Sequence, residues 1–270
     1  MLTSMLSGFT KPQPEMTKDF GERMLNSVAS QSIRHMFTRC DWLDVSIRCV
    51  PSSKLLQGII DSFRMEGQGL IIRRQFEAAE MMFETDAVSI DVAALLGGKI
   101  RLRQATQAIA KVVLTEDAIN RAFEADLVNQ RLVDVGDEDL TNLSGGEPLS
   151  FRDVSLSLQP NARVTVSAKT DLPNKEGVPL QFSAQLKTEK RRRILFDDIQ
   201  FVEDGIAEDV RPLSLALLPG FVGVLNRMVD LERFNLDGIL LRVNRLETEG
   251  KRLVFSGYAQ VDHFPNAGQN

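Results

Sequence analysis

The spacing of apolar residues changes from a helical repeat to a strand repeat near residue 40. Up to Arg39 the apolar residues recur at steps of three and four, which is typical of one face of an amphipathic helix. They are Phe20, Met24, Val28, Ala29, Ile33, Met36 and Phe37. From Leu43 onward, Val45, Ile47 and Cys49 alternate with polar residues, as in a half-buried strand. We therefore predict a helix over 16–39, preceded by a flexible tail over 1–15.

Strand-like alternation continues through most of the remaining chain. In a first β half, 40–133, it marks 60–65, 70–73, 81–90, 100–103 and 108–114, and glycines such as Gly67 and Gly69 are expected to separate the strands. An acidic, glycine-containing loop is predicted over 134–148. In a second β half, 149–265, the alternation returns at 154–158, 164–168, 180–186, 194–201, 238–246 and 252–261. Residues 266–270 are predicted to form a C-terminal tail.

Two helical segments interrupt these strands. Thr115 is a plausible N-cap for a short helix that ends near Asp126, with acidic residues in the first turn. Residues 212–228 are strongly apolar and predict a helix, or a pair of helices divided at Pro219 and Gly220.

The strands outnumber the principal helices, which favours the α+β class. A long antiparallel sheet hides its apolar face most readily by curving around the helices. We therefore predict a single domain over 16–265, built as a half-pipe in which a curved antiparallel sheet is wrapped around helices.

Composition and charge exclude several functions. The chain has 270 residues, of which 43% are hydrophobic and 26% are charged, as in ordinary folded proteins. Its formal net charge of -5 gives no overall attraction for nucleic acid. The basic run from Lys190 to Arg193 lies between two predicted strands and is expected to be a solvated turn, with a patch for anionic headgroups as the alternative.

No catalytic or metal-binding motif is present. His35 and His263 lack partners at metal-ligand spacing, and Cys40 and Cys49 form neither a CxxC motif nor a disulfide framework. The segment 93–100 lacks the first glycine of a phosphate loop and has Ile100 where that loop needs serine or threonine. We predict a protein that is not an enzyme and uses no cofactor and no metal.

The N-terminal residues lack the basic and apolar regions of an export signal, and no apolar run approaches the ~18 residues of a spanning helix. The expected location is cytoplasmic, with peripheral contact with a membrane left open.

Several segments together resemble the LmeA-type family of bacterial phospholipid-binding proteins, over about residues 40 to 265. The similar segments are 45–51, 54–58, the strands before Gly67 to Leu70, the positions Phe83, Val88, Ile90 and Asp91, and the strand and helix start at 112–120. In the second half they are 217–219 and the closing hairpin 239–264. The resemblance implies an elongated, tubular lipid-binding-like fold without catalytic residues. Named members of the family carry an export signal, which the N-terminal residues of this sequence do not predict.

These observations together predict non-catalytic binding, and with it transport, of a phospholipid or another long apolar ligand in a groove between sheet and helices. The groove is expected to be lined by apolar side chains from both halves of the chain. The candidates are Leu55, Leu56, Phe63, Leu70, Phe83, Leu217, Leu218, Phe221 and Leu225. The alternative is a structural module that docks on a protein partner through its apolar helix and N-terminal tail.

Overall fold

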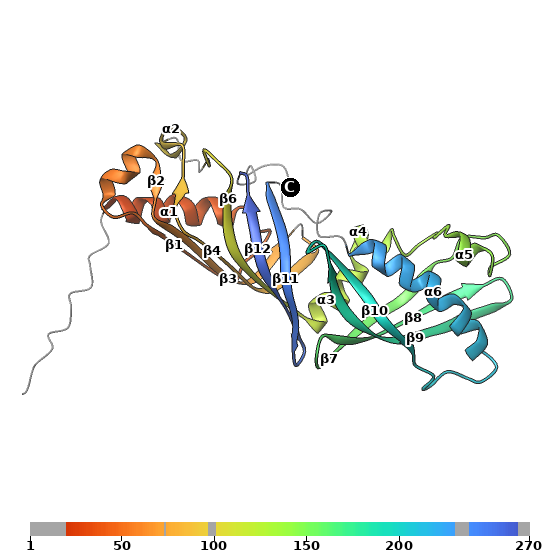
Figure 1. The fold of residues 1–270 in the computed structure, drawn as a ribbon. Coiled ribbons are helices and arrows are strands. Elements are labelled where there is room, and N and C mark those ends of the chain that lie inside the picture. The colour runs from red at the N-terminus through yellow and green to blue at the C-terminus, as the bar shows by residue number, and fades with distance from the viewer. Residues whose placement is uncertain (1–19, 73, 97–100, 230–237, 264–270) are drawn as a thin grey trace, which may run out of the picture.

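Two larger antiparallel sheets follow one another along an elongated molecule (Figure 1). The computed structural model describes residues 20–72, 74–96, 101–229 and 238–263; the predicted tails at 1–15 and 266–270 lie outside them. The first sheet has the order β1-β3-β4-β6-β12-β11, and the second has the order β10-β9-β8-β7. These sheets confirm the α+β class with curved antiparallel sheets, and the strands are divided between them rather than joined in one.

The six-stranded sheet combines strands from both ends of the sequence. Its strands are β1 (Trp42–Arg48), β3 (Ser62–Ile72), β4 (Phe76–Thr85), β6 (Thr106–Thr115), β11 (Ile239–Glu249) and β12 (Arg252–Val261). The register between β12 and β6 runs from Arg252 opposite Thr115 to Val261 opposite Thr106. The C-terminal hairpin therefore completes the sheet that the first half of the chain begins.

The four-stranded sheet is formed by β7 (Phe151–Gln159), β8 (Arg163–Leu172), β9 (Lys175–Glu189) and β10 (Arg193–Phe201). Residues 190–192 of the basic run form the turn between β9 and β10, as predicted, and Arg193 begins β10. There the Arg191 carbonyl accepts a hydrogen bond of 2.7 Å from the Val243 N–H in β11. This bond joins the second sheet to the edge of the first.

Gly67 and Gly69 do not separate two strands, so that prediction is wrong. β3 continues through both glycines and pairs with β4 from Phe63 opposite Thr85 to Ile72 opposite Phe76. Gly69 has a positive φ of 58°, and a Cβ atom there would lie 2.1 Å from the Asp41 carboxylate. The glycine therefore permits a close approach inside a continuous strand. The predicted strand over 81–90 is likewise divided into β4 and the short β5 (Val88–Ser89), which pairs with β2 (Ile59–Ile60).

Helix α1 (Phe20–Arg34) ends five residues earlier than the predicted helix. The reason is that the next backbone groups pair with the end of β3: the Thr38 N–H donates to the Ile71 carbonyl, and the Ile71 N–H donates to the Arg39 carbonyl, each at 2.8 Å. Ala29 and Ile33 are buried as the helical spacing predicted. The side chains of Phe20 and Met24 lie outside the described part of the chain.

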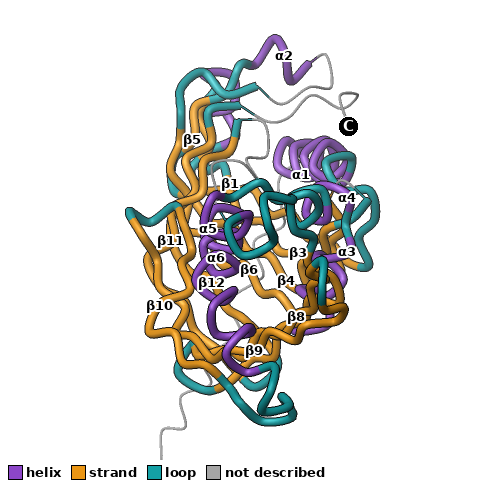
Figure 2. The backbone as a smooth tube through the Cα atoms, turned by 90° about the vertical axis from the view of Figure 1, so that its right-hand side faces the viewer, coloured by secondary structure: helices purple, strands orange, loops and turns teal. Residues whose placement is uncertain are grey.

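Helix α6 (Arg211–Met228) is a single helix with Pro219 in its interior, so the alternative of two helices is wrong. Gly220 lies against the fully buried Leu140 of the one-turn helix α5 (Glu138–Thr141), which falls within the predicted acidic loop. In the view turned by 90°, α6 lies inside the curve of the second sheet (Figure 2). The remaining helical elements are η1 (Ser52–Gln57), α2 (Val92–Leu96), α3 (Glu116–Glu124) and α4 (Asp126–Asn129), and α3 has the predicted Thr115 N-cap.

Asparagine side chains attach helices to three edge strands. Asn120 of α3 accepts from the Leu156 N–H at 2.7 Å and donates to the Leu156 carbonyl at 3.0 Å on β7. Asn226 of α6 accepts from the Phe196 N–H on β10 at 2.7 Å, and Asn26 of α1 accepts from the Ile47 N–H on β1 at 2.7 Å. An edge strand exposes unpaired backbone groups, and these amides satisfy some of them. The bonds thereby fix the position of each helix against its sheet.

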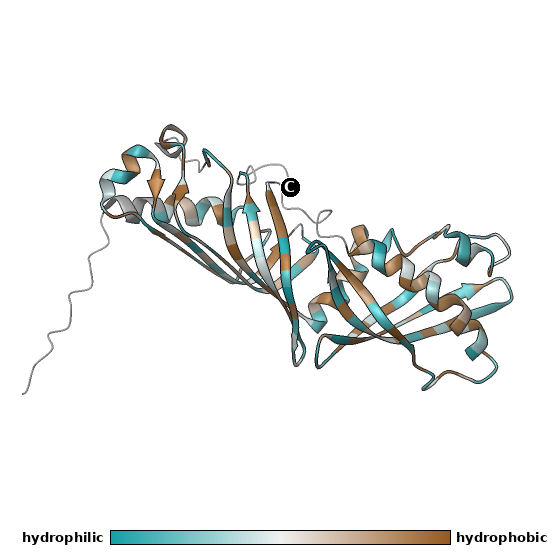
Figure 3. Ribbon diagram, in the orientation of Figure 1, coloured by the Kyte–Doolittle hydropathy of each residue, from teal (hydrophilic) through white to brown (hydrophobic). Residues whose placement is uncertain are grey.

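Polar and apolar residues alternate along the strands (Figure 3), and the inward residues form two apolar cores. One core packs α6 against the four-stranded sheet, where the rings of Phe151, Phe182 and Phe221 are in contact. The other lies between α1 and the six-stranded sheet and includes Ile33, Met65 and Met81. The second of these cores contains the cavity described below.

Candidate functional site

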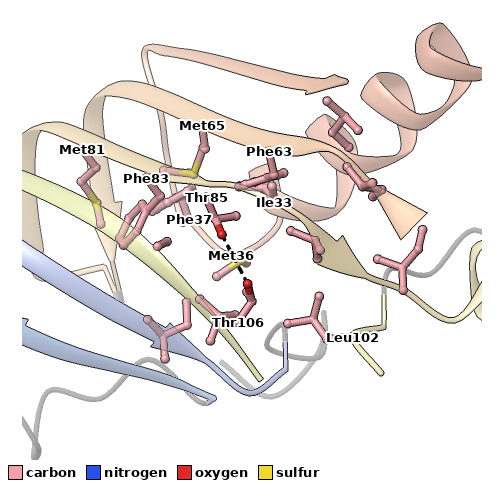
Figure 4. A pocket seen from close by; sticks show the side chains of 17 residues that line it. Ile33, Met36, Phe37, Phe63, Met65, Met81, Phe83, Thr85, Leu102 and Thr106 are labelled. Atoms are coloured by element: carbon pink, nitrogen blue, oxygen red, sulfur yellow. Dashed lines mark hydrogen bonds between the residues drawn. The ribbon is translucent and has the colours of Figure 1, made fainter. Parts of the chain in front are cut away.

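An apolar cavity lies between α1 and the six-stranded sheet. Its wall is formed by the end of α1 and the turn after it, by β1, β3, β4, β6, β11 and β12, and by the short β2–β5 pair. Seventeen side chains line it (Figure 4). They are Ile33, Met36, Phe37, Ile47, Ile60, Phe63, Met65, Met81, Phe83, Thr85, Val88, Ile90, Leu102, Thr106, Ala108, Ile239 and Val261.

The wall of this cavity is chemically uniform. All of its lining residues are apolar except Thr85 and Thr106, and none of them carries a charge. A site of this kind attracts apolar ligands because it removes their surface from water.

The hydroxyl groups of the two threonines form hydrogen bonds within the protein. The Thr85 hydroxyl donates to the backbone carbonyl of Gln107 at 2.7 Å and lies 3.3 Å from the Thr106 hydroxyl. Because the Thr85 proton is used on Gln107, the Thr106 hydroxyl is the donor of this pair. Both hydroxyl groups of the wall are therefore hydrogen-bonded within the protein.

The cavity is small in this conformation, with a volume of ≈ 60 Å³. That is room for a few water molecules at roughly 10–15 Å³ each, and not for a complete acyl chain. Met36, Met65 and Met81 form part of the wall, and methionine changes its rotamer easily to fill or open a space. Three flexible side chains therefore form part of the wall.

The structure brings four of the predicted lining residues to this region. Phe63 and Phe83 line the cavity directly. Leu70 is fully buried in the same core, and Leu55 is partly buried against it, but neither contributes to the cavity wall. Leu56, the next residue in η1, is 80% exposed and lies on the surface.

The other four predicted residues lie in a different core. Leu217, Leu218, Phe221 and Leu225 belong to α6 and pack against the four-stranded sheet, with Leu217 and Phe221 fully buried. The sequence pattern shows that these side chains are inward, but it does not distinguish a packed core from the wall of a cavity. The structure therefore does not place them beside Phe63 and Phe83.

Several lining residues were not among the candidates from the sequence. Met36 and Phe37 were recognised as inward residues of a helix, and their place in the cavity follows from the turn that ends α1. Ile239 and Val261 reach the cavity because β11 and β12 return to the first sheet. Alternation in 239–261 marks these residues as inward, and only the long-range pairing shows what they face.

A second, open hollow is polar and of a different kind. It is lined by the segment 130–135, the start of β10 and the end of α6, and contains Arg131, Arg193 and Arg227. Two of these arginines are paired with acids: Arg193 with Glu189 at 3.1 Å and Arg227 with Asp137 at 2.7 Å. These pairs favour a structural role for the hollow.

Within the described residues, no three metal-ligating side chains are grouped so that they could hold an ion. No helix in this part of the chain combines the length and apolar character needed to cross a membrane.

The protein is thus an α+β protein with curved sheets, and its apolar site lies between helix α1 and the six-stranded sheet. The model of the LmeA-like phospholipid-binding family matches residues 16–257. The chain therefore belongs to this family, as its sequence features had indicated. Searches among curated proteins and among solved structures found no match.

Proposed function

We propose that this protein binds phospholipid by taking an acyl chain into the cavity between α1 and the six-stranded sheet. The observation that carries the proposal is the uncharged wall, whose two hydroxyl groups are already hydrogen-bonded. Membership of the phospholipid-binding family supports the same class of ligand. The function is binding, without a reaction on the lipid.

Apolar burial supplies the affinity in this proposal. Each methylene transferred from water to the cavity contributes ~0.8 kcal/mol. Since the cavity is small, Met36, Met65 and Met81 must change rotamer as the chain enters. The polar headgroup stays outside, because the cavity wall contains no charge to pair with a phosphate.

Retention of lipid is the direct test. Protein purified from its own host is measured by native mass spectrometry, and its solvent extract is analysed for lipids. We expect a stoichiometric phospholipid. A mass equal to that of the bare chain, unchanged after incubation with phosphatidylcholine vesicles, would contradict the proposal and favour the docking module.

Substitution of two buried alanines by leucine tests where the lipid binds. Ala108 lines the cavity and Ala184 lies in the packed core of the second sheet, and both are buried in strands. Ala108→Leu fills the cavity. It is expected to reduce the amount of retained lipid and to change the free energy of unfolding only slightly. Ala184→Leu overpacks a filled core and costs roughly 1–3 kcal/mol, but retained lipid stays at the wild-type level. Equal retention by both variants would argue against this cavity.

A further inference from the structure

The loop between β1 and β3 exposes an unusual number of apolar side chains at one end of the molecule (Figure 1). Leu56 is 80% exposed, Val50 52% and Ile59 40%. All three fall within ten residues around η1. On an ordinary protein surface, exposed large apolar residues usually occur singly. Such a group of exposed apolar side chains is typical of a surface that binds a partner or a membrane.

This loop has a fixed structure. The Asp61 carboxylate accepts hydrogen bonds from the Val50 N–H at 2.7 Å and from the Lys54 ammonium at 2.6 Å. The Gly58 N–H donates to the Leu55 carbonyl at 2.9 Å, which closes the end of η1. The exposed side chains are therefore held outward by the backbone.

The inner side of the same loop belongs to the core around the cavity. Leu55 packs against this core while Leu56 faces solvent, and Ile60 lines the cavity while Ile59 is exposed. Ile47, just before the loop, also lines the cavity. Only the thickness of the loop separates its exposed apolar surface from the cavity.

The surroundings of the loop favour an anionic surface. The Arg103 guanidinium donates to the Gln57 carbonyl at 3.1 Å and so lies directly beside η1. Arg101 lies two residues away and is exposed, and within the described residues no ion pair joins either arginine to a carboxylate. Asp61, the acid within the loop, is neutralised by Lys54. Asp91, whose N–H donates to the Arg101 carbonyl at 2.8 Å, is an acid on the neighbouring segment, so Arg101 and Arg103 leave an excess of one positive charge there. This excess contrasts with the net charge of -5 of the chain.

We propose that this loop is a docking tip that inserts Leu56, Val50 and Ile59 into the surface of an anionic phospholipid bilayer, with Arg101 and Arg103 at the headgroups. The inference rests on the proposed function, since docking here brings the cavity next to the source of its ligand. Apolar insertion and attraction of basic residues to anionic lipids act together at such surfaces.

Flotation of the full chain with vesicles tests this tip. Vesicles of phosphatidylcholine alone are compared with equal mixtures of phosphatidylcholine and phosphatidylglycerol. The wild type is expected to bind the anionic vesicles more tightly. Leu56→Asp is expected to weaken this binding about tenfold or more, since it places a charge where the exposed leucine would insert into the bilayer. Arg101→Glu is expected to remove most of the preference for anionic vesicles.

Leu215→Asp is the matched control, because Leu215 is 53% exposed on α6, far from the tip. We expect it to bind vesicles as the wild type does. The inference is overturned if Leu56→Asp binds vesicles like the wild type, or if the wild type does not bind vesicles. It is also overturned if Leu215→Asp weakens vesicle binding as much as Leu56→Asp does. Lipid retained in the purified protein is measured separately. Retention without vesicle binding contradicts the tip alone, and vesicle binding without any retained lipid contradicts the cavity.

Discussion

The Thr85 hydroxyl, in the wall of the cavity, donates to the Gln107 carbonyl of the neighbouring strand β6 at 2.7 Å. A hydrogen bond in this position stabilises the sheet and at the same time removes a polar group from the surface that a ligand would contact. The polar atoms of the wall are therefore part of the fold.

Replacement of Thr85 by valine separates these two effects. Thr85→Val keeps the shape of the side chain and removes the hydrogen bond to Gln107, which is expected to lower the free energy of unfolding by about 1 kcal/mol. Retained lipid is expected to stay at the wild-type level. Urea unfolding and native mass spectrometry give the two readouts. Loss of lipid at unchanged stability would mean that the hydroxyl contacts the ligand.

Gly220 in α6 is expected to be intolerant of alanine. A Cβ atom at this position would lie 2.5 Å from the Cγ and Cδ2 atoms of the buried Leu140. Gly220→Ala is therefore expected to destabilise the protein by roughly 1–3 kcal/mol, although alanine favours a helix.

Gly223 provides the control in the same helix. A Cβ atom there meets only the flexible end of Arg227 at 3.4 Å, so Gly223→Ala is expected to be neutral or stabilising by up to about 1 kcal/mol. Thermal unfolding of the two variants gives the comparison. Equal effects at both positions would contradict the close contact between α5 and α6.

Glu116 makes stability depend on pH. Its buried carboxylate accepts from the Leu158 N–H at 2.8 Å and pairs with the Lys251 ammonium at 3.0 Å. The backbone hydrogen bond from Leu158, followed by the interaction with Lys251, lowers the pKa of Glu116 in the folded protein. A lowered carboxyl pKa adds stability above the pKa of the unfolded chain, and this stability is lost as pH falls through the folded pKa.

Glu116→Gln is expected to lower the free energy of unfolding at pH 7 by about 1–3 kcal/mol. The difference from the wild type is expected to shrink once the pH falls below about 4.3, where an ordinary glutamate is protonated. Urea unfolding across this range measures it. A difference that stays constant from neutral to acidic pH would show that the charge of Glu116 does not contribute to the free energy of unfolding.

Local patterns predicted the elements better than they predicted the site. Alternation placed Val45 and Ile47 on the buried side of β1, and helical spacing placed Ala29 and Ile33 on the buried side of α1. These positions follow from the period of a single helix or strand, and that period can be read directly from the spacing of apolar residues in the sequence.

The cavity depends on contacts between distant segments, and these were not predictable. Leu217 and Phe63 are both inward apolar residues, yet only Phe63 faces a space. The difference arises because β6 pairs with β12 and brings Val261 beside residues of α1 and β3. Likewise, the sequence could not show that Leu56 points away from the core that holds Leu55.

The most direct test of the account is to locate a bound acyl chain. A phosphatidylcholine with a photoreactive group at the end of one acyl chain is loaded into the full-length protein, activated by light and mapped by mass spectrometry of peptides. We predict cross-links to the cavity wall, in residues 33–37, 81–85 and 106–108. Cross-links confined to α6 and the four-stranded sheet would contradict the assignment of the lipid site to this cavity.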